Sequence, residues 1–129
     1  MILAIVQARC SSTRLPGKVL APVAGRAMIL RQLERLQRST AIDTLIVATS
    51  VEPSDDPLVE LMESEGITIR RGPLADVASR FAMVASEFSP DSIVRLTADC
   101  PLADHAVIDR VIGEHVSSGA DYTSNTQVR

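Results

Sequence analysis

The stretch ILAIVQARCSSTRLPGK, residues 2–18, determines how the fold begins. Residues 2–7 form an apolar run that ends in one polar side chain, a pattern typical of a short strand buried on both faces of a parallel sheet. The residues after it include the cations Arg9, Arg14 and Lys18, several hydroxyl groups and no acid. Cations this close together repel one another, so we expect an anion to complete the loop.

Beyond this stretch, apolar runs alternate with patterns typical of amphipathic helices. We expect strands at 44–49, 67–70 and 92–97, and helices at about 28–38, 56–66, 75–88 and 104–119. Asp56 followed by Pro57 is expected to start the second helix, and residues 120–126 to begin a fifth strand. Alternating strands and helices predict an α/β fold, a three-layer αβα Rossmann-like arrangement around a mostly parallel sheet.

The order of the elements also predicts where a ligand binds. The commonest doubly wound arrangement, 3-2-1-4, places the first strand beside the fourth, where the winding reverses and ligands bind at the carboxyl ends. The loop after the first strand is the basic one, and the loop after the fourth, ADCPLAD at 98–104, carries Asp99. We therefore expect a cationic loop and a carboxylate to face each other across one crevice.

Composition excludes several classes of partner. The chain has 129 residues, which suits one domain, and a formal net charge of -3. A mildly acidic protein with one basic loop is poorly suited to nucleic acid, which requires a broad basic face. No apolar run reaches the roughly 20 residues needed to cross a membrane, and no basic segment precedes residues 2–6 as in a signal peptide. Cys10 and Cys100 do not form a disulfide framework, so we expect small thiols in a reducing cytoplasm.

The residue types at this crevice suit a phosphate chain. Arg9 and Arg14 can bind phosphate oxygens in a forked manner, and Lys18 supplies a compact point charge. The loop sequence matches neither the glycine-rich signature of ATPases nor that of dinucleotide-binding proteins. A carboxylate such as Asp99 opposite these cations would hold Mg²⁺, which prefers one or two carboxylates together with phosphate oxygens. The set indicates phosphoryl or nucleotidyl transfer.

At this point the sequence resembles a known family. The stretches VQARCSSTRLPGKVLAPVAGRAMI (6–29), LIVATS (45–50), RGPLADVASRF (71–81) and VRLTADCPLAD (94–104) occur in the order seen in cytidylyltransferases. That family includes the acylneuraminate and deoxy-octulosonate enzymes, and the chain most resembles the spore coat polysaccharide biosynthesis branch. It departs from that branch at Cys10-Ser11, where the branch has Met-Gly, and at Ala98, where the branch has Gly.

The resemblance implies a function: transfer of CMP from CTP to a sugar or sugar acid, with release of pyrophosphate, for surface polysaccharide. It implies that the triphosphate is held by Arg9, Ser12, Arg14 and Lys18. It further implies that cytosine and ribose meet the backbone near Ala8 and the region of Asp76, that Arg80 also contributes to nucleotide binding, and that Asp99 ligates Mg²⁺. Catalysis would then depend on Arg9, Lys18 and Asp99.

The resemblance also bears on length. Family members are about twice as long, so residues 1–129 are interpreted as a shortened cytidylyltransferase-like nucleotide-binding domain. The full-length family implies a homodimer, and we expect exposed apolar surface where further chain would pack. Two alternative functions stay open: a nucleotide-binding module without turnover, and the same chemistry with another nucleotide (UTP or GTP) or another acceptor, such as a molybdenum cofactor.

Plainer roles are open for the loop residues. Arg9, Arg14 and Lys18 could be solvated loop charges, although clustering without acids favours anion binding. Asp99 could only brace the turn before Pro101, an ordinary role for aspartate.

Plainer roles are also open for residues on the expected helices. Asp76 and Arg80 are four apart, so an exposed ion pair is the default interpretation without the resemblance. Asp104 is expected to cap its helix, and His115 to continue the apolar face of that helix rather than act as a ligand or base.

Overall fold

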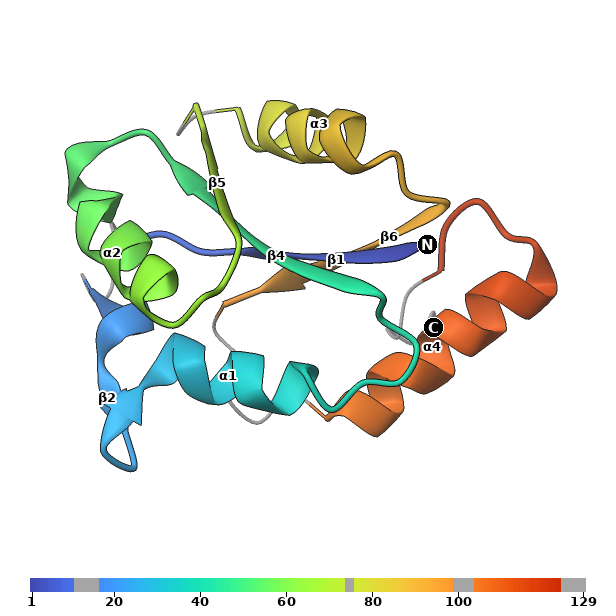
Figure 1. The fold of residues 1–129 in the computed structure, drawn as a ribbon. Helices are drawn as coiled ribbons and strands as arrows, with labels where there is room; N and C mark the ends of the chain where they lie inside the picture. The colour runs from blue at the N-terminus through green and yellow to red at the C-terminus, as the bar shows by residue number, and fades with distance from the viewer. Residues whose placement is uncertain (11–16, 74–75, 99–103, 124–129) are drawn as a thin grey trace, which may run out of the picture.

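The structure is a computed structural model that describes residues 1–10, 17–73, 76–98 and 104–123. At its centre lies a four-stranded parallel sheet with the order β5–β4–β1–β6 (Figure 1). The strands are β1 (Ile2–Gln7), β4 (Thr44–Ser50), β5 (Ile69–Gly72) and β6 (Ser92–Thr97). The helices are α1 (Met28–Leu36), α2 (Asp56–Ser64), α3 (Val77–Phe88) and α4 (His105–Ser118), with short 3₁₀ turns η1 (Lys18–Leu20) and η2 (Pro53–Asp55). The predicted parallel α/β sheet and its strand order are confirmed.

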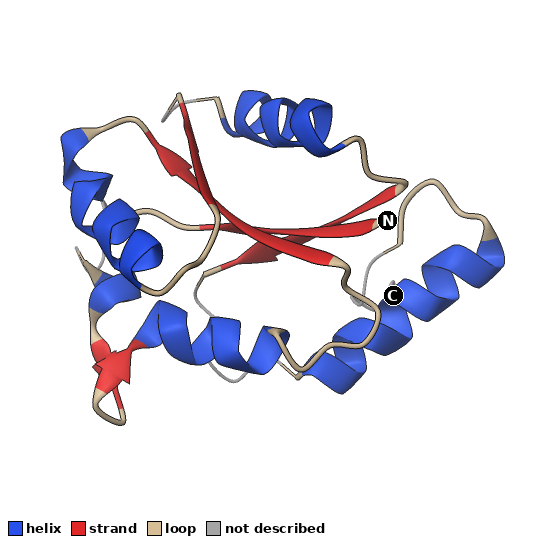
Figure 2. Ribbon diagram, viewed as in Figure 1, coloured by secondary structure: helices blue, strands red, loops and turns tan. Residues whose placement is uncertain are grey.

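The helices cover the sheet in two layers (Figure 2). On one face α3 packs through Val84 against Leu3, Ile5 and Ile46. On the other face a larger apolar cluster joins α1 and α2 to Val6 of β1 and to Leu45 and Val47 of β4. Within the described ranges, no helix combines the length and apolar character that crossing a bilayer requires.

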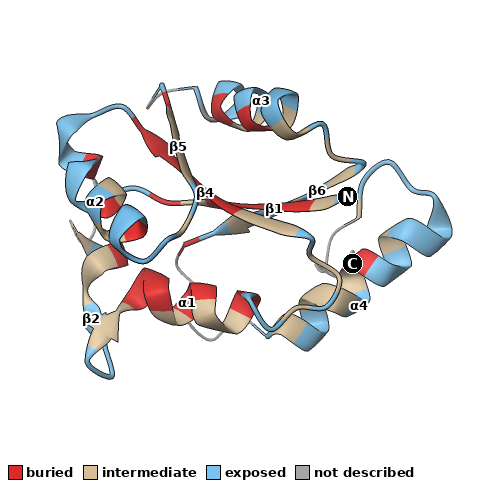
Figure 3. Ribbon diagram, in the orientation of Figure 1, coloured by how far each residue is buried: buried red, intermediate tan, exposed pale blue. Residues whose placement is uncertain are grey.

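The central position of β1 follows from its sequence. Leu3, Ala4, Ile5 and Val6 are all completely buried (Figure 3). Leu3 and Ile5 belong to one apolar cluster and Val6 to the other, as expected for side chains that alternate between the two faces of a sheet. A strand with apolar residues at every position is stable only where both faces are covered. The edge strand β6 instead alternates between half-buried and exposed residues, and Ile93 on it is 44% exposed.

Some boundaries differ from the predicted ones. Strand β5 begins two residues later than expected, because the N–H of Ile67 donates to the carbonyl of Met62 at 2.9 Å and so still belongs to the turn that ends α2. Helix α3 begins at Val77, since Asp76 occupies its N-cap. Residues 120–123 form no strand, and the rest of the expected fifth strand lies outside the described residues.

The start of α2 also corrects the sequence analysis. Asp56 was expected to be the capping residue, but Asp55 occupies the N-cap position and Asp56 is the first helical residue. The Asp55 side chain makes no capping hydrogen bond to α2 and instead accepts the N–H of Cys10. The caps of α4 agree with the sequence: Asp104 accepts the N–H of Ala106 at 2.8 Å, and Gly119 ends the helix at a φ of 67°.

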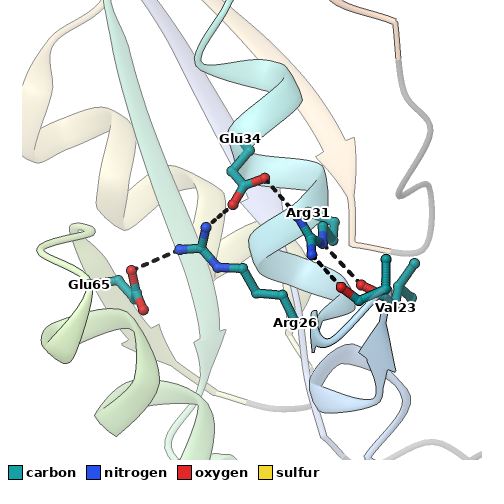
Figure 4. A network of polar contacts seen from close by, with 6 residues as sticks. Val23, Arg26, Arg31, Glu34 and Glu65 are labelled. Atoms are coloured by element: carbon teal, nitrogen blue, oxygen red, sulfur yellow. Dashed lines mark hydrogen bonds and ion pairs between the residues drawn. The ribbon is translucent and has the colours of Figure 1, made fainter.

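A short hairpin between η1 and α1 was not predicted. Its strands are β2 (Pro22–Val23) and β3 (Arg26–Ala27), joined by two residues with positive φ, as tight hairpin turns require. The Arg31 guanidinium of α1 holds the hairpin by donating to the carbonyls of Val23 and Ala24 (Figure 4). Each strand is only two residues long, too short to give a periodic signal in the sequence.

Arg26 of this hairpin bridges two helices, and its removal gives a first prediction. Its guanidinium pairs with Glu34 of α1 and with Glu65, just after α2, at 3.0 Å. All three side chains are more than one third exposed, so solvent screens both pairs. We expect Arg26→Ala to lower the free energy of unfolding in urea by only about 0.5–1 kcal/mol.

The matched control for that variant is Arg110→Ala. Arg110 pairs with Glu114 on the surface of α4, and both side chains are well exposed, so no measurable change is expected. A loss of more than about 2 kcal/mol for Arg26→Ala would contradict the small value expected for exposed pairs and assign the hairpin a larger share of the stability.

Candidate functional site

The predicted crevice begins where the chain leaves β1 and β6. The N–H of Ala8 donates to the carbonyl of Ala48 at 3.0 Å, and the N–H of Ala98 donates to the carbonyl of Gln7 at 3.0 Å. Ala8 and Ala98 are both buried. The segments that follow β1 and β6 therefore start side by side at the carboxyl edge of the sheet, at the point where the winding reverses. This is the edge at which doubly wound sheets bind ligands.

Two of the predicted cations lie close together in the backbone trace. The N–H of Gly17 donates to the carbonyl of Cys10 at 2.8 Å, so the chain returns to its starting point. Gly17 adopts a φ of 72°, a left-handed conformation that favours glycine. Arg9 immediately precedes this closure and Lys18 immediately follows it, and both side chains are exposed. The closure brings the backbone at Arg9 and Lys18 to the same end of β1.

Arg80 on α3 is the residue whose setting most clearly differs from the expected one. It is 1% exposed, and its Nε and Nη1 atoms have no hydrogen-bond partner. Burial and, next, the charge of Arg9 lower the pKa of the Arg80 guanidinium, whereas Asp55 opposes that shift. Arg80 thus lies within electrostatic reach of both residues. Unpaired buried donors are rare and costly, and they commonly mark a place where a ligand or ion completes the bonding.

Gly72 at the end of β5 makes room for Arg80. A methyl group built at Gly72 would lie 2.5 Å from the Cγ of Arg80, well inside van der Waals contact. The aliphatic part of the arginine therefore passes directly over the backbone of the strand. This close approach explains how so long a charged side chain is accommodated beneath the surface.

The expected ion pair between Asp76 and Arg80 is wrong. The Asp76 carboxylate accepts the N–H of Ser79 at 3.0 Å and its hydroxyl at 2.7 Å, and so caps α3. These bonds lower the pKa of Asp76. The four-residue spacing is that of a helical ion pair, but the Asp76 side chain instead bonds the first turn of α3 as its N-cap. A nucleotide role for the exposed Asp76 stays a prediction.

Asp55 is a residue of this region that the sequence analysis missed. It is completely buried, and its Oδ1 accepts the N–H of Cys10 at 2.6 Å. Its Oδ2 accepts the N–H of Ser50 at 3.3 Å and also bonds the Ser50 hydroxyl. The signal in the sequence was a serine at a strand end followed five residues later by an aspartate before a helix. That pattern is common, and the neighbouring Asp56 fits the role of helix cap equally well in the sequence.

Cys10 has the plain role that the sequence analysis gave it. It is buried at 8% exposure, and burial together with the charge of Asp55 raises the pKa of its thiol. A thiol that is harder to deprotonate is a poor nucleophile and a poor metal ligand. Cys100 lies outside the described residues.

His115 also keeps its plain role. Its Nδ1 contacts the hydroxyl of Thr123 at 2.8 Å near the end of α4, and it lies half-buried in a groove between β6 and α4. The expectation that it is neither a ligand nor a base stays a prediction.

A groove of the described chain lies elsewhere. It measures about 560 Å³ and runs between β6 and α4. Its lining includes Ile93, Val107, His115 and Tyr122, but not the residues at the closure of the β1 loop. Ile93, Val107 and Tyr122 are 44%, 48% and 83% exposed, which agrees with the expectation of exposed apolar surface. A groove of this kind is not the phosphate site.

Three predicted site residues, Ser12, Arg14 and Asp99, lie outside the described residues. Position 99 directly follows Ala98, which is bonded to Gln7 of β1. Within the ranges that the structure describes, no group of three or more histidine, cysteine or acidic side chains could hold a metal ion. The assignment of Asp99 to a metal stays a prediction.

Comparison with known proteins identifies the family. A family model described as cytidylyltransferase matches residues 3–129. The spore coat polysaccharide biosynthesis protein SpsF of Bacillus subtilis is 38% identical over 126 residues, which are 95% of this chain and 52% of that protein. A 3-deoxy-manno-octulosonate cytidylyltransferase of Anaeromyxobacter dehalogenans is 38% identical over 112 residues, 84% of this chain and 45% of that protein.

Solved structures agree with these relatives. A cytidylyltransferase from Leptospira borgpetersenii superposes with a TM-score of 0.85 at 34% identity, covering 90% of this chain and 49% of that one. The chain spans about half the length of the curated relatives it matches. Sequence, strand order and superposition lead to the same result: the chain belongs to the cytidylyltransferase family.

Proposed function

We propose that the protein takes part in transfer of CMP from CTP to a sugar or sugar acid, with release of pyrophosphate, in the synthesis of a surface polysaccharide. Membership of the cytidylyltransferase family supports the nucleotide and the type of reaction. The names of the relatives, a spore coat polysaccharide protein and a sugar-acid cytidylyltransferase, support the class of acceptor.

The observation that carries the proposal is the buried Arg80 with two unpaired nitrogen atoms. An arginine held this way, with Arg9 close enough to lower its pKa, forms part of a site that needs an anion. Lys18 adds a further charge at the closure of the β1 loop. A triphosphate carries enough negative charge to satisfy all three cations at once, and phosphate oxygens accept the forked bonds of arginine.

In the proposed reaction, the chain's own residues bind and stabilise charge. The acceptor hydroxyl forms a bond to the α-phosphorus and loses its proton to solvent, while the bond to the bridging oxygen of pyrophosphate breaks. Negative charge accumulates on the departing pyrophosphate. We assign the stabilisation of that charge to Arg9, Arg14, Lys18 and Arg80, with Ser12 as a hydroxyl donor. Such electrostatic stabilisation is the main catalytic contribution in phosphoryl-type transfers.

The residues proposed for the base and ribose are the backbone near Ala8 and the start of α3 at Asp76. Asp99 is proposed to hold Mg²⁺, because one carboxylate with phosphate oxygens is the donor set that this ion prefers. When bound, the ion neutralises phosphate charge and orients the triphosphate.

A binding measurement tests the proposal directly. We expect the 129-residue chain to bind CTP in the presence of Mg²⁺, as measured by isothermal titration calorimetry. We expect Lys18→Ala to weaken that binding by roughly 10- to 100-fold, because a charge-assisted contact to phosphate contributes about 1.5–3 kcal/mol.

Arg110→Ala is the matched control, since it also removes one exposed positive charge but on the surface of α4. Its affinity for CTP should equal that of the wild type. Failure of the wild-type chain to bind CTP or any other nucleoside triphosphate would contradict the proposal. Thermal shifts with the four nucleotides separate CTP from UTP or GTP as the preferred substrate.

Nucleotide binding without turnover is the second candidate. The observation that favours it is the position of the groove between β6 and α4, whose lining excludes Ala8, Arg9, Lys18 and Arg80. That groove is therefore not joined to the cations proposed to bind phosphate. Release of pyrophosphate from CTP with a panel of sugar acids distinguishes the two functions: release above that of Lys18→Ala supports transfer, and binding without release supports the second candidate.

A further inference from the structure

Asp55 has a setting that none of the proposed roles explains. Its carboxylate is completely buried, although buried carboxylates are costly unless their oxygen atoms are bonded. It accepts the N–H of Cys10 at 2.6 Å, the N–H of Ser50 at 3.3 Å and the Ser50 hydroxyl. These bonds join three segments: the start of the β1 loop, the end of β4 and the start of α2.

The bond to Cys10 bears directly on the proposed phosphate site. The carbonyl of Cys10 accepts the N–H of Gly17, so the residue that Asp55 holds is also the residue that closes the loop. Arg9 precedes Cys10 and Lys18 follows Gly17 in the chain. One buried carboxylate therefore fixes the backbone from which both cations project.

The charge of Asp55 would by itself act against this site. Its charge raises the pKa of the Arg80 guanidinium, so an anion bound to Arg80 would also feel that charge. A negative charge near a phosphate site lowers its affinity by Coulomb repulsion. A carboxylate buried in that position is expected only if its structural contribution outweighs the repulsion.

We propose that Asp55 is a positioning residue of the phosphate site, which holds the amide of Cys10 so that Arg9 and Lys18 act on the same triphosphate. The inference rests on the proposed function. It goes beyond that function because Asp55 touches no phosphate and acts only through the loop that it anchors.

The variant Asp55→Asn tests the inference because the two possible effects have opposite signs. Removal of a nearby negative charge, taken alone, strengthens anion binding. Loss of the anchor weakens it, since the amide replaces one of the two acceptor oxygens with an NH2 donor. It therefore cannot accept the Cys10 N–H and the Ser50 donors on separate oxygens, as the carboxylate does. We expect at least a tenfold loss of affinity for inorganic tripolyphosphate and for CTP with Mg²⁺, measured by calorimetry and corrected for the folded fraction from urea unfolding.

Asp109→Asn is the matched control. Asp109 also ties a loop: it accepts the hydroxyls of Ser39 and Thr40 and the backbone N–H groups of Thr40 and Ala41. This loop lies before the amino end of β4. It should lose stability without a change of affinity. If Asp55→Asn does not fold, Ser50→Ala replaces it: this variant keeps the carboxylate and its Cys10 bond, loses the hydroxyl donor, and should weaken tripolyphosphate binding in the same direction by a smaller factor.

Each outcome is decisive. The positioning role is supported if Asp55→Asn binds more weakly and Asp109→Asn does not. Where Asp55→Asn does not fold, weaker binding by Ser50→Ala supports it instead. Unchanged or tighter binding overturns it, and so does an equal loss in Asp109→Asn. Wild-type binding of tripolyphosphate without any binding of nucleotides overturns the proposed function while the Asp55 comparison still decides the positioning role. Binding of neither ligand by the wild type overturns both.

Discussion

Replacement of Arg80 by methionine should make the unliganded protein more stable and should at the same time remove most of its affinity for CTP. Arg80 is 1% exposed, and its Nε and Nη1 atoms lack partners. A methionine fills much of the same volume without donors that need bonding, and replacing buried ionic groups with apolar ones is often neutral or stabilising by about 1–4 kcal/mol. We expect a gain of about 1 kcal/mol, because Asp55 keeps its bonds from Cys10 and Ser50.

Two measurements on the same variant test this expectation. Urea unfolding without ligand gives the change in stability, and calorimetry with CTP and Mg²⁺ gives the change in affinity. Loss of forked, charge-assisted bonds to phosphate should reduce the affinity about 100-fold, which equals roughly 2.7 kcal/mol. A gain in stability with a loss of binding is typical of a residue retained for function at the expense of stability.

Arg70→Met is the matched control, since Arg70 lies on β5 and reaches the same helix, α3. Its guanidinium pairs with Glu87 at 2.6 Å and lies over the ring of Phe88, and its side chain is 37% exposed. Its replacement should cost a little stability and leave CTP binding unchanged. If Arg80→Met instead destabilises the protein and binds CTP as the wild type does, Arg80 is a structural residue.

The sequence predicts the main sheet well because each central element has a local cause. The apolar run of residues 2–6 leaves β1 no stable place except between two covered faces. Right-handed crossovers then restrict where the other strands lie, which is why the order around β1 could be expected before the structure. The elements that were missed are short: β2 and β3 have two residues each and depend on Arg31 of α1 to hold their turn.

The site is less predictable because burial depends on distant parts of the chain. Arg80 and Asp76 have the spacing of an exposed pair, and only the contact of Arg80 with Gly72 of β5 reveals that the arginine is covered. Likewise, the bond between Asp55 and Cys10 joins positions 45 residues apart. Arg9 and Lys18 could be found from the sequence because they cluster in one loop. Asp55, which bonds that loop, comes from another element and could not.

Replacement of Gly72 by alanine should destabilise the protein and displace Arg80. The new methyl group would lie 2.5 Å from Cγ of Arg80 and 3.4 Å from its Cβ, and these atoms are close to the helix backbone, so they cannot move aside easily. The strand is also held in place, since the carbonyl of Gly72 accepts the N–H of Val51 at 3.0 Å. Overpacking of this kind costs about 1–3 kcal/mol, which urea unfolding measures, and we expect CTP affinity to fall with it.

A double-mutant cycle attributes that cost to one contact. In an Arg80→Ala background the methyl group at position 72 meets no arginine, so Gly72→Ala should there be neutral, or stabilising by about 0.5 kcal/mol from reduced chain entropy. The resulting coupling of about 1–3 kcal/mol is well above the scatter of additive pairs. Gly113→Ala in α4, where a methyl group meets no atom within 4 Å, controls for the intrinsic effect of alanine and should be stabilising. A full cost that persists without Arg80 would show that the strand itself requires glycine, and the arginine would then not depend on Gly72 for its buried position.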